Sequence, residues 1–306
     1  MFEFKNILQS CKEFKKEAID VLGTGQSIYE FEENHGLYDI VILTASPDEF
    51  DTVKSVLEKV KPIIFNKNDS TIYYQGLAKG KNKSLKVLIP FPYSQGLEAV
   101  SSLTTKVVSK FRPKYLFMIG ICAGNKNICK IGDVIIADKS LNYQGVVEIE
   151  RKDENKDKKF MHNLYSINGH LKNQLELYTH SSIFKSIQDT YPNRDKIETN
   201  LTAHIGLLVT GSSLLRSSTI MQEINDIYVG VKGLDMETYG LYYSATQVFK
   251  DYAPNFLSIK GVSDYGDGTN HKLSLSERRN YSLYTSTNTM MNFIQNYIEW
   301  TAHNNV

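Results

Sequence analysis

Apolar and polar residues follow two periods along this chain. Short apolar runs are typical of buried strands, whereas apolar residues recurring every three to four positions are typical of helices. Runs of the first kind predict strands at 38–44, 72–77, 85–90, 115–124, 131–138, 203–211 and from Phe256 to Asp264. The helical spacing predicts helices at 1–22, 48–60, 163–191 and 276–300. It also predicts one helix that ends at about Lys110 and one that runs from the turn at 233 to about Phe249.

Strands that alternate with helices favour a central sheet covered by helices on both faces. We therefore expect an α/β fold, with one domain built on a mixed, mostly parallel sheet. The length of 306 residues is enough for one large domain. We expect residues 1–36 to form an N-terminal helical extension and residues 37–306 to form the domain.

The charge narrows the class of partner, and the cysteine content narrows the cellular location. The net charge is only +1 and no long basic block occurs, which argues against nucleic acid as the partner. No apolar run has the length of a membrane span, and the N-terminus lacks a signal-peptide pattern. Three cysteines in a long chain do not suggest a disulfide framework, so we expect a reduced, cytoplasmic protein.

Three carboxylates are predicted at loop or strand ends. Glu49 follows the first strand in a turn that begins a helix, Glu237 follows a predicted turn, and Asp264 ends a strand. Ligands of open α/β sheets bind outside the carboxyl ends of the strands, so Glu237 and Asp264 are expected to share a pocket. Glu49 could also serve only as a helix cap, since acidic residues favour helix N-termini.

Two further stretches have a distinctive composition. The apolar strand 115–124 ends in Cys122-Ala123-Gly124, whose small side chains would let a flat ligand approach the backbone. Residues 148–159 are mostly charged with mixed signs, which predicts a solvated loop or lid.

The chain resembles the nucleoside phosphorylase and nucleosidase superfamily. The resemblance rests on Asp235-Met236-Glu237, on Ser263-Asp264-x-x-Asp267 and on the apolar strand ending at Gly124, in family order. It covers about residues 38–300 and is strongest to methylthioadenosine/S-adenosylhomocysteine nucleosidases and to nucleosidase-like effectors of bacterial defence.

The resemblance implies a role for each site residue. Asp264 would be the general acid toward purine N7, and Ser263 would orient it. Glu237 would accept the ribose 2′- and 3′-hydroxyls, Met236 would pack on the sugar, and Glu49 would activate water. No metal or cofactor is expected, because no metal-ligand spacing occurs.

Hydrolysis is favoured over phosphorolysis. Related phosphorylases carry an arginine where this chain has Met118, and a carboxylate at position 49 would repel phosphate. The expected reaction is hydrolysis of a purine nucleoside or nucleotide, extending to ATP in antiviral defence, by a homo-oligomer. A phosphorylase, a non-catalytic nucleoside sensor and a structural interaction protein remain as alternatives.

The sequence departs from the family pattern in two parts of the substrate site. The base-stacking aromatic of the family is replaced by Leu214, for which Tyr143 or Tyr265 could compensate. Lys272 and Arg278 follow the acid closely in a polar, basic segment, so we expect them to bind 5′-phosphates, unless Arg278 and Arg279 simply face water.

Overall fold

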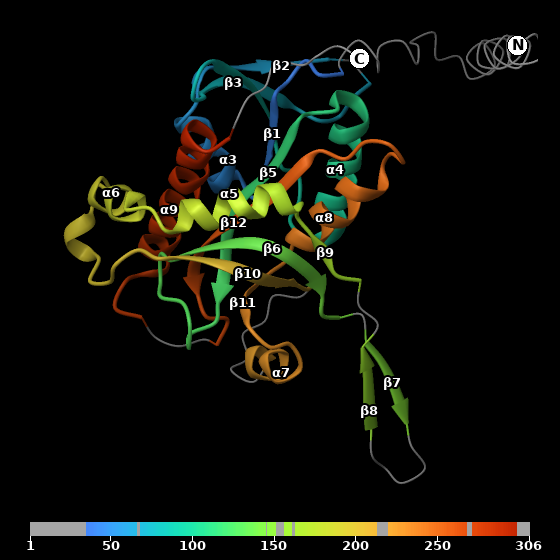
Figure 1. The fold of residues 1–306 in the computed structure, drawn as a ribbon, viewed down its shortest axis with the longest axis vertical. Coiled ribbons are helices and arrows are strands. Elements are labelled where there is room, and N and C mark those ends of the chain that lie inside the picture. Colours follow the sequence, from blue (N-terminus) through green and yellow to red (C-terminus); the bar gives the residue numbers. More distant parts are fainter. Residues whose placement is uncertain are drawn as a thin grey trace, which may run out of the picture.

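The computed structural model describes residues 35–298, apart from 66–67, 145, 151–155, 161–162, 213–219 and 268–270. The predicted helix 1–22 and Leu214 therefore lie outside the described residues, as does most of the expected extension 1–36. Figure 1 shows a central sheet with helices on both sides, which confirms the predicted α/β architecture.

The main sheet is mixed and runs in the order β11-β10-β6-β12-β5-β1-β4-β3-β2, with β9 paired to β6. Parallel pairs join β1 to β4 and β5, β5 to β12, and β10 to β6 and β11, while the other pairs are antiparallel. Its strands are β1 (Ile40–Leu43), β2 (Glu58–Ile63), β3 (Tyr73–Lys79), β4 (Ser84–Pro90), β5 (Tyr115–Gly124), β6 (Val134–Asn142), β9 (Tyr165–Ser166), β10 (Ala203–Thr210), β11 (Val231–Asp235) and β12 (Asn255–Asp264).

One end of the sheet closes on itself. The end of β5 pairs antiparallel with β11, Gly124 opposite Gly233 and Ala123 opposite Leu234. A Cβ at position 233 would lie 2.5 Å from the carbonyl oxygen of Ala123, so this approach requires glycine. The closure brings the residues after β11 beside the carboxyl end of β5.

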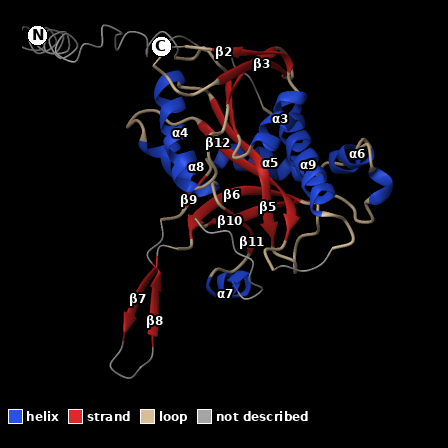
Figure 2. Ribbon diagram, turned by 180° about the vertical axis from the view of Figure 1, so that it is seen from behind, coloured by secondary structure: helices blue, strands red, loops and turns tan. Residues whose placement is uncertain are grey.

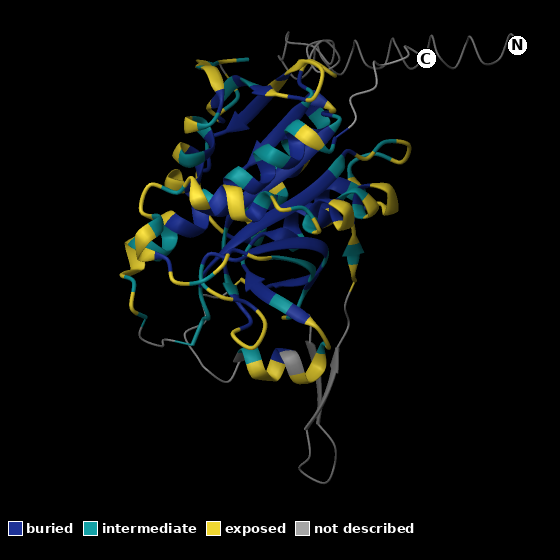
Figure 3. Ribbon diagram, turned by 60° about the vertical axis from the view of Figure 1, so that its left-hand side comes forward, coloured by how far each residue is buried: buried dark blue, intermediate teal, exposed yellow. Residues whose placement is uncertain are grey.

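The helices cover both faces of the sheet (Figure 2). α9 packs on β12 and β5, while α4 packs on α8, which lies against β6. The strands between these layers are largely buried, as Figure 3 shows. The described helices are α3 (Pro47–Ser55), α4 (Leu97–Phe111), α5 (Gly169–Thr179), α6 (Ile183–Asp189), the 3-10 turn η1 (Arg194–Lys196), α7 (Ile220–Ile227), α8 (Thr238–Gln247) and α9 (Leu275–Asn296).

Four predicted elements are corrected by the structure. The helix expected at 48–60 ends at Ser55, and the edge strand β2 follows it and pairs antiparallel with β3. Lys59 has φ of +52°, outside the right-handed helical region, so the helix does not extend to residue 60. The stretch read as a turn at 233 is the end of strand β11, whose short run of apolar and small residues gave no clear strand period.

The other two corrections concern the middle of the chain. The charged stretch at 148–159 contains a separate hairpin of β7 (Val146–Glu150) and β8 (Lys156–Phe160) rather than a loop. Its backbone register places Glu148 opposite Lys158 and Glu150 opposite Lys156. The single helical region expected at 163–191 is divided into β9, α5 and α6.

Candidate active site

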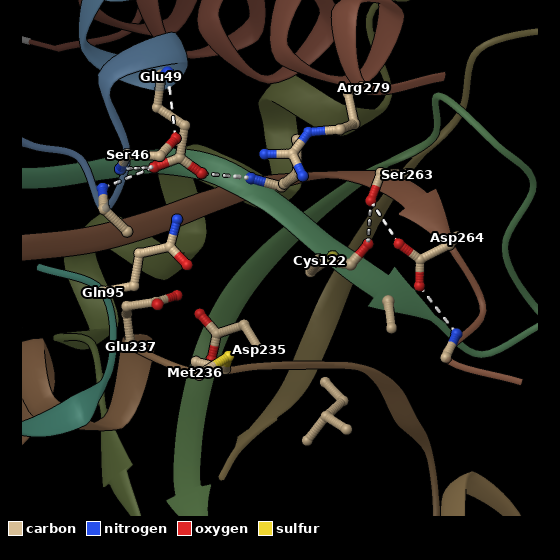
Figure 4. A pocket seen from close by; sticks show the side chains of 15 residues that line it. Ser46, Glu49, Gln95, Cys122, Asp235, Met236, Glu237, Ser263, Asp264 and Arg279 are labelled. Carbon is tan, nitrogen blue, oxygen red and sulfur yellow. Dashed lines mark hydrogen bonds between the residues drawn. The ribbon is translucent and has the colours of Figure 1, made fainter. Parts of the chain in front are cut away.

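A pocket of about 180 Å³ lies at the carboxyl ends of β1, β5, β11 and β12 (Figure 4). Adjacent parallel strands end at the same edge, so residues distant in sequence meet there. The lining residues include Ala45, Ser46, Glu49, Gln95, Ile121, Cys122, Ala123, Leu234, Asp235, Met236, Glu237, Ser263, Asp264, Gly266 and Arg279.

Glu49 lies in the first turn of α3 and is only 4% exposed. Its Oε2 accepts hydrogen bonds from the main-chain N–H of Ala45 (2.6 Å) and Ser46 (3.2 Å), and Oε1 accepts one from Ile121 (3.2 Å). The predicted cap is therefore real, since Ser46 and Glu49 form a capping box. The carboxylate also lines the pocket, so capping and a role in the site are compatible.

Glu237 follows β11 and is buried beside the loop that precedes α4. Its Oε1 accepts a hydrogen bond from the N–H of Gly96 at 3.1 Å. Gly96 has φ of +102°, a backbone conformation that favours glycine and directs this N–H to the carboxylate. The sequence-predicted pair of Glu237 and Asp264 does line one pocket.

Lys260 is a buried charged residue beside the site that sequence reasoning missed. It lies in β12 with 0% exposure, and its Nζ is 3.5 Å from Oε2 of Glu237 and 3.3 Å from Oδ2 of Asp235. Buried lysines are rare unless paired, so a single charge inside the apolar run 256–262 was the available signal. Asp235 is held in turn by the hydroxyls of Thr210 and Thr238.

Burial and charge change the acidity of this cluster. Burial raises the pKa of Glu237 to about 7, against the opposing effect of Lys260, with Asp235 and Glu49 raising it further. Burial alone would lower the pKa of Lys260, but Asp235, Glu237 and Glu49 together raise it above its ordinary value. Lys260 is therefore a cation at neutral pH, and Glu237 is an acid whose charge changes near neutrality.

Asp264 ends β12 on another side of the pocket. The hydroxyl of Ser263 donates to its Oδ2 at 2.8 Å, and the N–H of Gly266 donates to its Oδ1 at 2.9 Å. Ser263 thus contacts the Asp264 carboxylate, and the acid role of Asp264 stays a prediction. Figure 4 shows Asp264 apart from Glu49 and Glu237, with the cavity between them.

The small residues at the end of β5 are divided between two roles. Cys122 and Ala123 line the pocket together with Met236, whereas Gly124 lies at the pairing with β11 and is absent from the lining. Burial raises the pKa of the Cys122 thiol well above its ordinary value, so Cys122 lacks the thiolate character of a nucleophile and acts as a small buried side chain.

The basic residues after Asp264 lie differently from the expectation. Lys272 is exposed and pairs with Glu198 at 2.9 Å, and Arg278 donates to the carbonyl oxygens of Ser263 and Leu273. Neither lines the pocket, but Arg279 does. The phosphate role of Lys272 and Arg278 stays a prediction.

These groups form a chemically complete set for cleaving a polarised bond. One carboxyl group can donate a proton, a second can accept one, and a third pairs with a buried lysine and can accept hydroxyl groups. Among the described residues, no group of three or more His, Cys, Asp or Glu is arranged to hold a metal ion.

Sequence comparison identifies relatives of known type. A 5′-methylthioadenosine/S-adenosylhomocysteine nucleosidase from Buchnera aphidicola (subspecies Schizaphis graminum) is 27% identical over 218 residues, covering 70% of this chain and 82% of the relative. ATP nucleosidase Cap17 from Escherichia coli is 21% identical over 246 residues, covering 75% of this chain. The match covers only 46% of Cap17, so the chain corresponds to about half of that relative.

Structural comparison gives the same fold. The 5′-methylthioadenosine/S-adenosylhomocysteine nucleosidase of Neisseria meningitidis, in complex with methylthio-immucillin-A, superposes with a TM-score of 0.60 at 16% identity. The match covers 84% of this chain and 98% of that one.

Further findings bear on membranes and on the family. None of the helices in the described part of the chain combines the length and apolarity needed to cross a membrane. The family model of the phosphorylase superfamily matches residues 39–299, which include the whole fold around the pocket. The chain is therefore a member of the phosphorylase superfamily.

Proposed function

We propose that the protein hydrolyses the N-glycosidic bond of a purine nucleoside or nucleotide and releases the base. The observation that carries the proposal is that Glu49, Glu237 and Asp264, from three separate elements, line one pocket. The similarity to nucleosidases adds support, and the similarity to Cap17 extends the candidate substrates to ATP and the candidate role to antiviral defence.

In the proposed reaction, Asp264 in its acid form donates a proton to purine N7. The bond between C1′ and N9 then breaks with its electron pair passing to the base, and the ribose becomes cation-like, as in other glycoside hydrolyses. Glu49 removes a proton from the water whose oxygen bonds to C1′. Solvent returns that proton to Asp264, which completes the cycle.

Glu237 holds the ribose in this scheme. As an anion it accepts the 2′- and 3′-hydroxyls, while Met236 packs beside the sugar. Lys260 supports this role because its charge lies 3.5 Å from the carboxylate and favours the ionised form. Cys122 and Ala123 leave room for a flat base near Asp264.

Water is favoured over phosphate as the nucleophile. A phosphate ion at the position of the water would lie beside the Glu49 carboxylate, and the two negative charges would repel each other. Residue 118, where related phosphorylases carry arginine, is a fully buried methionine in β5. Arg279 is the basic residue that remains in the lining, and it enters from α9.

The direct test is to incubate the protein with purine nucleosides and nucleotides, with and without phosphate. Hydrolysis predicts free base together with the free sugar, independent of phosphate. Ribose 1-phosphate that forms only with added phosphate would instead establish the phosphorylase alternative. Binding of a nucleoside without any base release would establish the sensor alternative.

We also propose a cytoplasmic homo-oligomer. Support for the location is that Cys122 and Cys129 are free and buried, which suits a reducing compartment. The large number of tyrosines, 19, supplies side chains suited to subunit contacts. Analytical ultracentrifugation at several protein concentrations tests the assembly, and a monomer throughout would contradict it.

A further inference from the structure

Arg279 is the basic residue among those that line the pocket in the described part of the chain. The same lining contains four carboxylates, those of Glu49, Asp235, Glu237 and Asp264. A cation in this setting either neutralises a neighbouring carboxylate or binds an anionic part of the ligand. The contacts of each group distinguish these two roles.

The carboxylates are held by other partners. Glu49 accepts three main-chain N–H groups, and Glu237 contacts Gly96 and Lys260. Asp264 is held by Ser263 and Gly266, and Asp235 by Lys260 and two threonines. Arg279 makes no hydrogen bond or ion pair within the usual limits to any described residue, so its guanidinium does not serve to fix these carboxylates.

The start of α9 gives Arg279 a defined position. The helix begins at a capping box formed by Ser274 and Glu277. Arg278 fastens this turn to the end of β12 through the carbonyl oxygen of Ser263. Because successive helix residues point about 100° apart, Arg279 is directed away from that contact and into the pocket.

Figure 4 shows the guanidinium of Arg279 reaching from α9 between Glu49 and Ser263. In the same view, Asp235, Met236 and Glu237 lie on the opposite side of the cavity. If Glu237 holds the ribose hydroxyls and Asp264 the base, the α9 side remains for the other end of the sugar, which carries the 5′ substituent. A planar guanidinium with five donors matches a phosphoryl group in shape and charge.

We propose that Arg279 binds a phosphoryl group of the substrate at the 5′ position and thereby selects nucleotides over nucleosides. This inference rests on the proposed base-releasing reaction at the same pocket. Free phosphate shares the same chemistry, so the experiment must separate a 5′-phosphate from an added phosphate ion.

The experiment compares kcat/KM for adenosine, AMP and ATP in wild type, Arg279→Met and Arg279→Lys, with and without inorganic phosphate. Methionine keeps an unbranched side chain but removes the charge. Losing a hydrogen bond to a charged group lowers affinity by about 10- to 100-fold. Arg279→Met should therefore lower the ratio of kcat/KM for AMP to kcat/KM for adenosine by about that factor. The ratio for Arg279→Lys should lie between those of wild type and Arg279→Met, because lysine keeps the charge but cannot form the paired hydrogen bonds of a guanidinium.

Two further variants serve as controls. Lys185→Ala removes one positive charge from an exposed pair on α6 and should leave the ratio unchanged. Lys272→Ala tests the exposed lysine after Asp264. A changed ratio in Lys272→Ala without one in Arg279→Met would overturn the inference, as would preference for adenosine in wild type. The inference would also be overturned if Arg279→Met lost activity only in assays that contain inorganic phosphate. Arg279 would then bind free phosphate and not a 5′-phosphate.

Binding measurements separate this inference from the proposed reaction. Calorimetry with AMP and adenosine on the Asp264→Asn variant, with and without Arg279→Met, reports affinity without turnover. Base release with no AMP preference would overturn the role of Arg279 and leave hydrolysis intact. No base release from any substrate, together with tighter AMP binding that depends on Arg279, would overturn hydrolysis and support the phosphate contact.

Discussion

The Nζ of Lys260 lies 3.5 Å from Oε2 of Glu237, and both side chains are buried at the same edge of the sheet. Asp235 lies on the other side of the lysine at 3.3 Å, so one cation serves two carboxylates. The positive charge of Lys260 opposes the effect of burial and favours the ionised form of Glu237. The protonation and stability of the proposed site therefore depend on a residue that does not itself line the pocket.

Replacing the proposed general acid should stop base release. Asp264→Asn keeps the shape of the side chain but has no proton to donate to N7, and acid catalysis of this kind contributes about 10²- to 10⁴-fold. The measurement is single-turnover release of adenine, with circular dichroism as the control for folding. Turnover near the wild-type rate in a folded variant would rule out this role of Asp264.

Glu49→Gln and Glu237→Gln should fail in different ways. Glu49→Gln is expected to lower kcat with KM nearly unchanged, because Glu49 acts on the water and not on the sugar. Glu237→Gln should also raise KM, since an amide offers one acceptor oxygen where the carboxylate offers two. Initial-rate kinetics on both variants distinguish the roles, which identical kinetic defects would contradict.

The raised pKa of Glu237 predicts a pH dependence. Below about pH 7 the carboxylate takes up a proton and loses part of its capacity to accept the ribose hydroxyls. We therefore expect kcat/KM to fall as the pH is lowered through this value in wild type. Glu237→Gln should lack this limb of the profile, and an unchanged limb in that variant would assign the titration to another group.

Removing Lys260 should destabilise the protein and change the acidity of the site. Lys260→Met leaves Asp235 and Glu237 buried without their cation, and breaking a buried ion pair costs about 3–5 kcal/mol. Urea unfolding measures this loss. The pH limb of kcat/KM should also move to higher pH, because the cation that favours ionised Glu237 is gone.

A second substitution provides the matched control for Lys260. Adding Glu237→Gln to Lys260→Met removes one of the two uncompensated charges and should recover part of the lost stability. Equal stability of wild type and Lys260→Met would show that the ion pair is not needed for folding. No recovery in the double variant would indicate that packing of the lysine side chain dominates.

The local pattern of apolar and polar residues by itself determined several of the strands and pointed to the carboxylates of the candidate site. The apolar runs specified β1, β4, β5, β10 and β12, because strands covered by helices consist mostly of apolar residues. The turn at Ser46–Glu49 and the motifs around Glu237 and Asp264 identified the carboxylates, and the structure brings all three into one pocket. Where the pattern was short or highly charged, as in β11 and the β7–β8 hairpin, it did not specify the element.

Only the tertiary structure decided which neighbours these residues have. The pairing of Gly124 with Gly233 and the N–H of Gly96 at Glu237 join segments more than one hundred residues apart, and no local period encodes such contacts. The same holds for Lys260, whose role depends on the carboxylates around it, and for Arg278 and Arg279, adjacent in sequence but turned apart by the helix. The sequence determined which chemical groups are available, and packing decided which of them face the cavity.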